Sequence, residues 1–351
     1  MKYLIVGPSW VGDMVMAQTL FITLKQQNPD AKIDVLAPAW SGPILQRMPE
    51  VHRSIEMPLG HGKLNLGTRK KIGHSLRVEH YNQAIVLPNS FKSALIPFWA
   101  NIPIRTGWRG EMRFGLLNDI RALDKEQLPL MVERFVALGY PKGQAMPSPL
   151  PRPQLQVEPA SVDSALHRHR LQVDAPILGL CPGAEFGPSK QWPAGYYGEV
   201  ALNLLKQGWR VWLFGSEKDR QITTEIMSYI PDPHRERCCN LAGETTLADA
   251  VDLLSKTTTV VSNDSGLMHI AAALSRPLVA VYGSTTASHT PPMNTNSKTL
   301  WLKLECSPCF KRECPLGHHN CMKQLDPDMV MAAIEQLGRE QHESLIGVHQ
   351  E

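Results

Sequence analysis

Residues 258–273 read TTVVSNDSGLMHIAAA, and this stretch decides the fold of the C-terminal half of the chain. Its four β-branched residues predict a buried strand, residues 262–266 predict a tight polar turn, and an apolar helical run begins at Leu267. A helix that starts at such a turn presents unpaired N–H groups and the positive end of its dipole, and Gly266 has no side chain to hold a phosphate away. We therefore predict a site for a phosphate-bearing ligand. The alternative is an ordinary helix N-cap formed by Asp264 or Ser265.

The composition of the whole chain limits the possible classes of protein. Of the 351 residues, 43% are hydrophobic and 20% are charged, which predicts a soluble globular protein of two domains. No segment approaches the run of about 18 apolar residues that a membrane-spanning helix needs. The N-terminal residues MKYLIVG predict a β-strand rather than a signal peptide, so we expect a cytoplasmic protein. The net charge of +3 is slight, and we expect no nucleic-acid partner.

The chain begins with a predicted strand at residues 2–6 and a glycine-rich turn, GPSWVGD, at 7–13. A helix with apolar residues at three- and four-residue spacing is predicted over 14–27. The turn lacks the lysine and Ser/Thr of a P-loop and the G-x-G-x-x-G of dinucleotide sites, and Asp13 would repel a phosphate. A carboxylate there suits proton abstraction, so Asp13 is a candidate general base. The alternative is that Asp13 only caps the helix.

Strand and helix patterns then alternate along the chain. The predicted strands are 32–38, 52–57, 83–90, part of 102–113, 177–181, 209–214, 258–261 and 277–282, and a helix is predicted to start at the end of 83–90. The predicted helices are 42–48, 130–138, 160–170, 194–206, 218–228, 246–255, 267–274 and 326–341. A mobile loop that enters a helix is predicted over 58–74. Residues 141–159 contain six prolines, and we place the domain linker there. The predicted fold class is therefore α/β, with two Rossmann-like, doubly wound parallel-sheet domains at 1–155 and 156–325.

Three polar turns follow strands of the second domain, at 182–193, 215–219 and 262–266. Because ligands of open α/β sheets lie at the carboxyl ends of the strands, we expect the three turns to line one pocket. Lys190 offers a cation for a pyrophosphate, and Glu217 offers a carboxylate for ribose hydroxyls. This combination favours a nucleotide-linked donor over hydride chemistry.

Basic residues are concentrated in the first 115 residues of the chain. They include Arg69, Lys70, Lys71, Arg105, Arg109 and Arg113, and Lys92 falls in the first turn of a predicted helix, where a cation is disfavoured unless an anion is near. An anionic substrate or membrane surface could use these side chains. The alternative is a solvated basic face.

Six motifs resemble those of the ADP-heptose:lipopolysaccharide heptosyltransferases of Gram-negative bacteria, members of glycosyltransferase family 9. They are GPSWVGDM (7–14), LPNSFKSAL (87–95), RTGWRGEMR (105–113), CPGAEFGPSKQWP (181–193), LFGSEKD (213–219) and SNDSGLMHIAAAL (262–274). The resemblance runs over nearly the whole chain. It implies a GT-B fold whose N-terminal acceptor-binding domain and C-terminal ADP-heptose-binding domain face a central crevice. It also implies that a C-terminal helix within 326–351 packs back on the N-terminal domain.

The resemblance further implies roles for individual residues. Asp13 and Lys190 are implied as catalytic, the first as general base and the second as a ligand of the donor phosphate. Donor binding is implied for Gly183, Ser189, Lys190, Ser216, Glu217, Asp264, Ser265, Gly266, Leu267, Met268 and His269. Acceptor binding is implied for Trp10, Asn89, Lys92, Arg69, Lys70, Lys71, Arg105, Arg109 and Arg113.

The implied reaction is an inverting transfer of heptose from ADP-L-glycero-D-manno-heptose to the first heptose of the lipopolysaccharide inner core. The implied partners are ADP-heptose and a heptosylated Kdo-lipid A acceptor, and peripheral contact with the cytoplasmic face of the inner membrane is an option. No cofactor and no catalytic metal are expected, because Lys190 and helix N–H groups can meet the charge of the leaving ADP. The alternatives are a heptosyltransferase of type I or III, acting at another core position, or a non-catalytic nucleotide-sugar-binding protein. A pure binder would not need Asp13.

Four of the seven cysteines lie close together in the sequence CSPCFKRECPLGHHNC, residues 306–321. Cys306, Cys309, Cys314 and Cys321 could close a structural, tetrahedral zinc site. The spacing differs from that of two-pair zinc ribbons, so disulfides or free thiols remain as alternatives.

Overall fold

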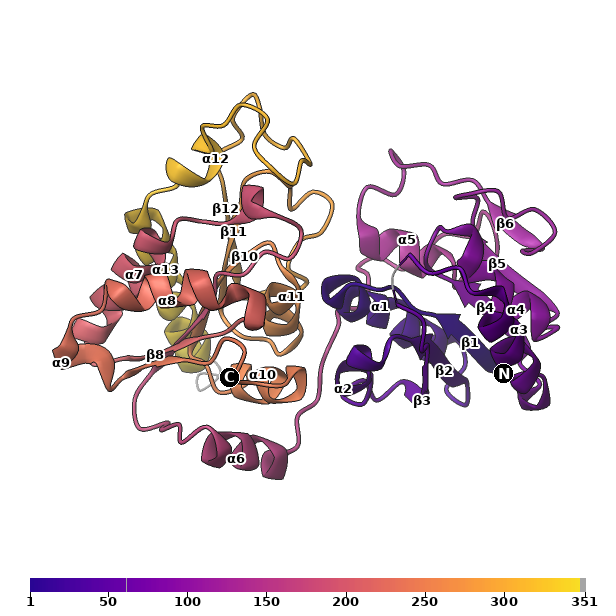
Figure 1. Ribbon diagram of the computed structural model, residues 1–351, viewed down its shortest axis with the longest axis horizontal. Helices are drawn as coiled ribbons and strands as arrows, with labels where there is room; N and C mark the ends of the chain where they lie inside the picture. The colour runs from indigo at the N-terminus through magenta and orange to yellow at the C-terminus, as the bar shows by residue number, and fades with distance from the viewer. Residues whose placement is uncertain (61, 348–351) are drawn as a thin grey trace. The chain divides into compact units, whose positions relative to one another are not determined.

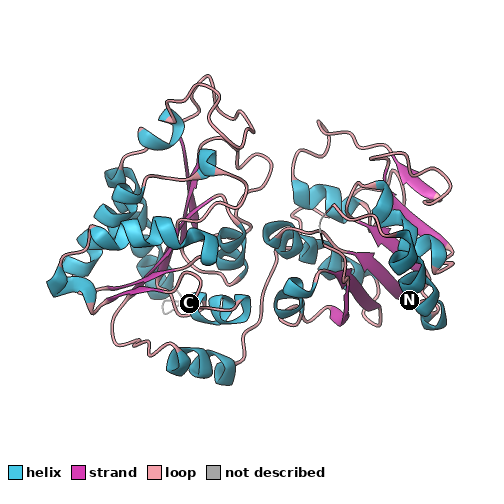
Figure 2. Cartoon of the chain, viewed as in Figure 1, coloured by secondary structure: helices cyan, strands magenta, loops and turns pink. Residues whose placement is uncertain are grey.

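Two six-stranded parallel sheets, one in each half of the chain, are the framework of the fold (Figure 2). The computed structural model describes residues 1–60 and 62–347. The chain divides into one unit of Met1–Gln156 with Ser288–Thr290, and a second unit of Val157–Ala287 with Pro291–Glu351. The division falls one residue after the boundary that we predicted, inside the proline-rich linker. Residues 348–351 of the predicted C-terminal segment lie outside the described residues.

The sheet of the first unit has the strand order β3-β2-β1-β4-β5-β6. Its strands are β1 (Lys2–Val6), β2 (Lys32–Ala37), β3 (Val51–Glu56), β4 (Gln83–Val86), β5 (Ile104–Trp108) and β6 (Asp119–Arg121). The winding direction reverses between β1 and β4, which is the switch point at which doubly wound sheets bind ligands. The glycine-rich turn with Asp13 follows β1 and the turn with Asn89 follows β4, so both lie at this switch point.

The sheet of the second unit has the order β12-β11-β10-β7-β8-β9. Its strands are β7 (Ile177–Cys181), β8 (Arg210–Leu213), β9 (Cys238–Asn240), β10 (Thr259–Asn263), β11 (Leu278–Tyr282) and β12 (Ser297–Trp301). Here the direction reverses between β7 and β10, so the turn that carries Lys190 and the turn that carries Asp264 flank one switch point. The two parallel sheets confirm the predicted α/β fold class.

Helices flank the sheet of each unit (Figure 1). Those of the first unit are α1 (Val11–Gln27), α2 (Gly42–Leu45), α3 (Leu66–Ser75), α4 (Leu95–Trp99) and α5 (Met131–Ala137). Those of the second unit are α6 (Pro159–Arg168), α7 (Ala194–Lys206), α8 (Arg220–Ser228), α9 (Asp232–Arg235), α10 (Leu247–Leu254), α11 (Gly266–Ala273), α12 (Asn320–Lys323) and α13 (Pro327–Gly347). In the described part of the chain, we find no helix that is both long enough and apolar enough to cross a membrane.

The central strands of both sheets are almost entirely buried, as continuous apolar sequences predict for parallel sheets covered on both faces. Every residue of β7, β10 and β11 is buried. Close packing also explains Gly7, which ends β1: a Cβ atom there would lie 2.8 Å from the Cε atom of Met14 on α1. The turn after β1 can therefore press directly against the start of α1.

Residues 58–74 were predicted to form a mobile loop that enters a helix, and this helix is present. Helix α3 begins at Leu66, and its N-cap is Asn65, whose Oδ1 atom accepts a hydrogen bond from the backbone N–H of Thr68 at 3.2 Å. Asparagine is among the residue types preferred at helix N-caps. Arg69 lies on the buried side of this helix.

The packing of the C-terminal helix on the N-terminal domain stays a prediction, and the contacts that the structure shows for this helix lie within the second unit. Helix α13 belongs to the second unit and lies against α7, β11 and β12. Its buried residues Val330, Ala333, Ile334 and Leu337 recur at three- and four-residue spacing and join the core that contains Val279 and Val281. The apolar stripe of the helix covers this sheet, which would otherwise expose apolar surface to water.

The linker is attached to the first unit by side-chain hydrogen bonds. The buried amide of Gln18 on α1 donates to the carbonyl of Gln154 at 2.8 Å and accepts from the N–H of Gln154 at 2.9 Å. Residues Ser288–Thr290, from the C-terminal half of the chain, also belong to this unit. The carbonyl of His289 accepts a hydrogen bond from the N–H of Met131 at 2.9 Å.

A buried carboxylate organises the side of the first sheet away from the switch point. Asp34 on β2 is fully buried and accepts hydrogen bonds from the hydroxyl of Tyr81 at 2.6 Å and from Arg53 at 2.9 Å, and His52 Nδ1 lies 2.8 Å away. Burial by itself would raise the pKa of Asp34, but these three partners outweigh burial and lower it. The network therefore depends on an ionised Asp34.

Replacing Asp34 by asparagine should lower the free energy of unfolding by about 3 kcal/mol at pH 7, because hydrogen bonds to a buried charge are lost. The pKa of Asp34 is lower in the folded than in the unfolded protein. The stability that ionised Asp34 gives to the folded protein is therefore complete above the unfolded-state pKa of about 4, and it is lost as the pH falls through the folded-state pKa. Urea denaturation should therefore show a smaller difference in the free energy of unfolding between wild type and Asp34→Asn at pH 3 than at pH 7. Asp30→Asn, at an exposed position, is the control. An equal difference at both pH values would contradict the network's dependence on charge.

Candidate functional site

A charged pair lies at the switch point of the second sheet. The Nζ atom of Lys190, in the turn after β7, lies 2.6 Å from Oδ2 of Asp264, which follows β10. The same oxygen accepts a hydrogen bond from the hydroxyl of Thr285, after β11, at 2.6 Å. The side chains of Lys190 and Asp264 are 14% and 6% exposed, so the pair is largely shielded from water. The turns that the sequence singled out after β7 and β10 are thus brought together, and Asp264 holds the lysine in place.

Asn263, the last residue of β10, joins the same two turns. Its side chain is fully buried, and its Oδ1 atom accepts hydrogen bonds from the N–H of Trp192 at 3.1 Å and the hydroxyl of Tyr197 at 3.0 Å. Its Nδ2 atom donates to the carbonyl of Pro182 at 2.6 Å. One amide therefore fixes both ends of the Lys190 turn against the end of β10.

Helix α11 begins directly after this pair. Ser265 is its N-cap, with the hydroxyl accepting the N–H of Met268 at 3.3 Å, so the N-cap interpretation of Ser265 holds. The N–H groups of Gly266 and Leu267, in the first turn, have no partner within the helix and form its positive end. Capping by Ser265 and anion binding by this end are therefore compatible.

Met268 and His269 point into the protein. Met268 is fully buried, and its sulfur accepts a hydrogen bond from Tyr282 at 3.3 Å. His269 is 5% exposed, and burial lowers its pKa to about 4. At neutral pH His269 is therefore uncharged and adds no positive charge to the site.

The turn after β8 contacts the turn after β7 through Asp219. The Oδ2 atom of Asp219 accepts hydrogen bonds from the N–H of Ser216 at 2.7 Å and from its hydroxyl at 2.8 Å. A Cβ atom at Gly183 would lie 2.6 Å from the carboxylate of Asp219, so only glycine allows this approach. Glu217 is 73% exposed and pairs with Arg220 at 2.7 Å. Its carboxylate thus faces solvent at the same edge of the sheet.

Asp13 lies in the first turn of α1, at the switch point of the first sheet. Asp13 is half-buried, at the end of the helix where the dipole is positive. Trp10, the N-cap residue, is 43% exposed. The carbonyl of Asn89, in the neighbouring turn, accepts the N–H of Glu111 at 2.9 Å. An acid, an aromatic ring and an amide therefore lie on two turns that adjoin one switch point.

Three of the seven arginines and lysines assigned to the acceptor are occupied within the first unit. Arg113 is fully buried and donates to the carbonyls of Trp108 and Pro88. Arg69 donates to the carbonyls of Leu64, Lys63 and Lys92, and Arg105 to those of Leu116 and Ile102. These guanidinium groups hold loops in place and are not presented to a ligand. Lys70, Lys71 and Arg109 are exposed, and Lys92 is half-buried.

The four clustered cysteines are half-buried free thiols. Within residues 1–60 and 62–347, no three His, Cys, Asp or Glu side chains are arranged to hold a metal ion. Charges on Cys306, Cys309 and Cys314 contribute to raising the pKa of Cys321, after burial, so the four thiols lie near one another. The zinc and free-thiol interpretations both stay predictions. Hydrogen bonds from backbone N–H groups, that of His319 first, lower the pKa of Cys314.

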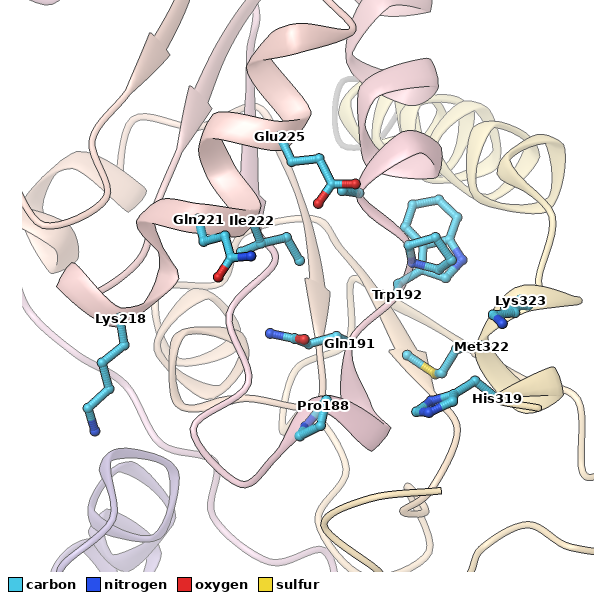
Figure 3. A pocket seen from close by; sticks show the side chains of 12 residues that line it. Pro188, Gln191, Trp192, Lys218, Gln221, Ile222, Glu225, His319, Met322 and Lys323 are labelled. Carbon is cyan, nitrogen blue, oxygen red and sulfur yellow. The ribbon is translucent and has the colours of Figure 1, made fainter. Parts of the chain in front are cut away.

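A cavity of about 370 Å³ lies beside the turn that carries Lys190 (Figure 3). Gln191 projects toward its middle, Gln221 and Glu225 line it from α8, and Met322 lines it from α12. Among the described residues, neither Lys190 nor any residue of α11 lines it. The cavity is therefore separate from the charged pair, although it adjoins the same turn.

The sequence analysis did not assign Asn263, Thr285 or Asp219 to the site. Asn263 was part of the quoted turn but carried no role. Thr285 could have been found by the rule that named the other turns, because it follows the carboxyl end of β11. Asp219 could not have been found in this way, because its role depends on contact with Gly183, which is distant in sequence.

Comparisons with known proteins agree with this architecture. The chain belongs to glycosyltransferase family 9 (heptosyltransferase), which its residues 69–320 match. The lipopolysaccharide heptosyltransferase 2 of Escherichia coli (strain K12) is 50% identical over 96% of this chain and 98% of the relative. The lipooligosaccharide heptosyltransferase 2 of Haemophilus influenzae (strain ATCC 51907 / DSM 11121 / KW20 / Rd) is 49% identical over 96% of this chain and 99% of the relative.

Among solved structures, the E. coli ADP-heptose lps heptosyltransferase II superposes with a TM-score of 0.89 and 47% identity, covering 97% of this chain and 100% of that chain. Two Rossmann-like units with this similarity define a glycosyltransferase of the GT-B fold. The predicted family and fold are thereby confirmed.

Replacing Thr285 by valine should weaken the binding of ADP, the nucleotide expected from the sequence, by about fivefold. The substitution keeps the shape of the side chain but removes the hydrogen bond that orients Asp264, and with it Lys190. Isothermal titration calorimetry measures the affinity. Thr257→Val is the matched control, because it also removes a buried hydroxyl, one that donates to the carbonyl of Leu254. Equal ADP affinities in wild type and Thr285→Val would refute this role.

Proposed function

We propose that this glycosyltransferase moves L-glycero-D-manno-heptose from ADP-heptose to the first heptose of the lipopolysaccharide inner core, with inversion at the transferred carbon. The observation that carries the proposal is the Lys190–Asp264 pair beside the start of α11. The pair lies in a chain about half identical, over almost its whole length, to proteins named heptosyltransferase 2. These names favour the type II acceptor over types I and III.

The donor would bind to the second unit. A diphosphate placed against the N–H groups that begin α11 would meet the positive end of the helix and the ammonium group of Lys190. Both groups become more stabilising as the bond to the sugar breaks and ADP gains negative charge. Because they are fixed beforehand by Asp264, Thr285 and Asn263, little reorganisation is needed during the reaction. We propose that these groups serve without a metal ion or other cofactor.

Asp13 would act as the general base. Its carboxylate would accept the proton of the acceptor hydroxyl as that oxygen attacks the anomeric carbon of the donor heptose, and ADP would leave from the opposite face. The exposed cations Lys70, Lys71 and Arg109 suit the phosphates and sugar acids of a lipopolysaccharide core. We therefore assign the acceptor to the first unit and the donor to the second.

We further propose that the protein works in the cytoplasm and touches the inner membrane peripherally when it meets its lipid-linked acceptor. The loop between β5 and β6 supports this contact, since Met112 and Phe114 are 81% and 67% exposed and Arg109 is exposed on the same loop. Apolar and basic side chains together suit an anionic lipid surface.

The test is transfer from ADP-heptose to two acceptors in anionic vesicles, the Kdo-only core and the core that already carries one heptose, with and without EDTA. We expect product only with the second acceptor, no effect of EDTA, and protein sedimenting with the vesicles. Product on the first acceptor would indicate type I activity. ADP binding without any product would favour a non-catalytic binder, and loss of product with EDTA would refute metal independence. Protein left in the supernatant would exclude the membrane contact.

Replacing Asp13 by alanine should reduce turnover by about 100-fold or more, as expected for loss of a general base. The affinity for ADP should stay within about twofold, because the donor groups lie in the second unit. Single-turnover transfer and calorimetry measure the two quantities. Asp30→Ala, which removes an exposed carboxylate just after α1, is the control and should leave both unchanged. Normal turnover in Asp13→Ala would remove Asp13 from the mechanism.

A further inference from the structure

The cysteine-rich segment, residues 306–321, has no role in the function proposed so far, yet it contacts the turn that carries Lys190. The N–H of Ser189 donates to the carbonyl of Arg312 at 3.1 Å, and the hydroxyl of Ser189 donates to the carbonyl of Lys311. Ser189 is only 2% exposed. The residue before Lys190 is therefore hydrogen-bonded to two consecutive residues of the segment.

Gly187 makes this approach possible. Its φ is +153°, and a Cβ atom there would lie 2.5 Å from the carbonyl oxygen of Arg312 and 3.0 Å from its Cα atom. Any other residue would push the two backbones apart. The position of Arg312 is thus determined by the donor turn itself, through backbone contacts that do not involve its side chain.

The side chains of Arg312 and Lys190 both approach the ring of Phe186. The central carbon of its guanidinium group is 5.5 Å from the centre of the Phe186 ring, and the Nζ atom of Lys190 is 5.0 Å from the same point. Both distances are in the range of cation–π interactions. Phe186 is therefore in contact with two cations that come from separate parts of the chain.

The charges around this turn are not balanced. The negative charge of Asp264 offsets the positive charge of Lys190, and that of Glu185 offsets Lys218, whose Nζ atom lies 2.6 Å from Oε1 of Glu185. In the described part of the chain, no carboxylate lies within ion-pair distance of Arg312, whose side chain is exposed. Arg312 thus contributes an uncompensated positive charge beside the proposed donor site, and a guanidinium group suits phosphate because it can donate two parallel hydrogen bonds.

We propose that Arg312 binds the diphosphate of the donor nucleotide, together with Lys190 and the start of α11. This inference rests on the proposed function, because it assigns a further residue to the same donor. It also gives the cysteine-rich segment a purpose, which is to carry Arg312 to the donor turn. As ADP leaves, the added negative charge meets Arg312, for which the described residues supply no ion-pair partner.

The test compares Arg312→Gln with Lys311→Gln by calorimetry, using ADP and adenosine as probes. Lys311 is the matched control, since it is the adjacent exposed cation and its carbonyl also holds Ser189, so both variants keep the backbone contacts. We expect Arg312→Gln to raise the Kd for ADP about tenfold or more and to leave that for adenosine unchanged. Lys311→Gln should change neither by more than about twofold. Arg312→Lys should recover part of the loss.

The same measurements separate this proposal from the wider one. If wild type does not bind ADP, the proposed donor is wrong and this inference falls with it. If wild type binds ADP and Arg312→Gln binds it equally well, only this inference is wrong. If Arg312→Gln weakens the binding of ADP and of adenosine equally, Arg312 stabilises the fold rather than binding the diphosphate, and the inference is overturned. A loss specific to ADP that shrinks as salt is added would support it.

Discussion

The ion pair between Lys190 and Asp264 is the interaction on which the donor site depends. A shielded lysine is costly unless a carboxylate is near, and a shielded carboxylate is costly unless its oxygens are hydrogen-bonded. Asp264 meets both needs, because the same oxygen that faces Lys190 also accepts the hydroxyl of Thr285. The pair holds the cation at the start of α11 but cancels its charge. A donor that carries a diphosphate therefore needs positive charge from elsewhere, which is where Arg312 enters.

Both units use the same sheet order but assign different chemistry to the switch point. In the first unit, the turn after β1 presents the carboxylate of Asp13, which suits a proton acceptor. In the second, the turn after β7 presents the ammonium group of Lys190, which suits an anion. The difference lies only in turn residues, since the buried strands around them are equally apolar. The two sheets therefore support two chemical roles on one type of scaffold.

The central strands and long helices could be predicted because parallel sheets buried on both faces leave continuous apolar runs. The edge strands β6, β9 and β12 were missed, since sequences such as Asp119–Arg121 and Cys238–Asn240 are short and partly polar. They become strands because a neighbouring strand offers unpaired backbone groups. Of the proposed site residues, those on the turns after β7 and β10 could be named from the strand-end rule.

The sequence by itself determined the fold class, the family and the turns that hold Asp13, Lys190 and Asp264, because local patterns and motifs are properties of neighbouring residues. Only the tertiary structure decided which charges are available. It buried Arg113 among backbone carbonyls, left Arg109 exposed, and placed Arg312 beside a turn more than 120 residues earlier in the chain, at Ser189. It also placed α13 on the second sheet. The physical reason is that burial and the pairing of charges depend on contacts between distant segments, which no local pattern contains.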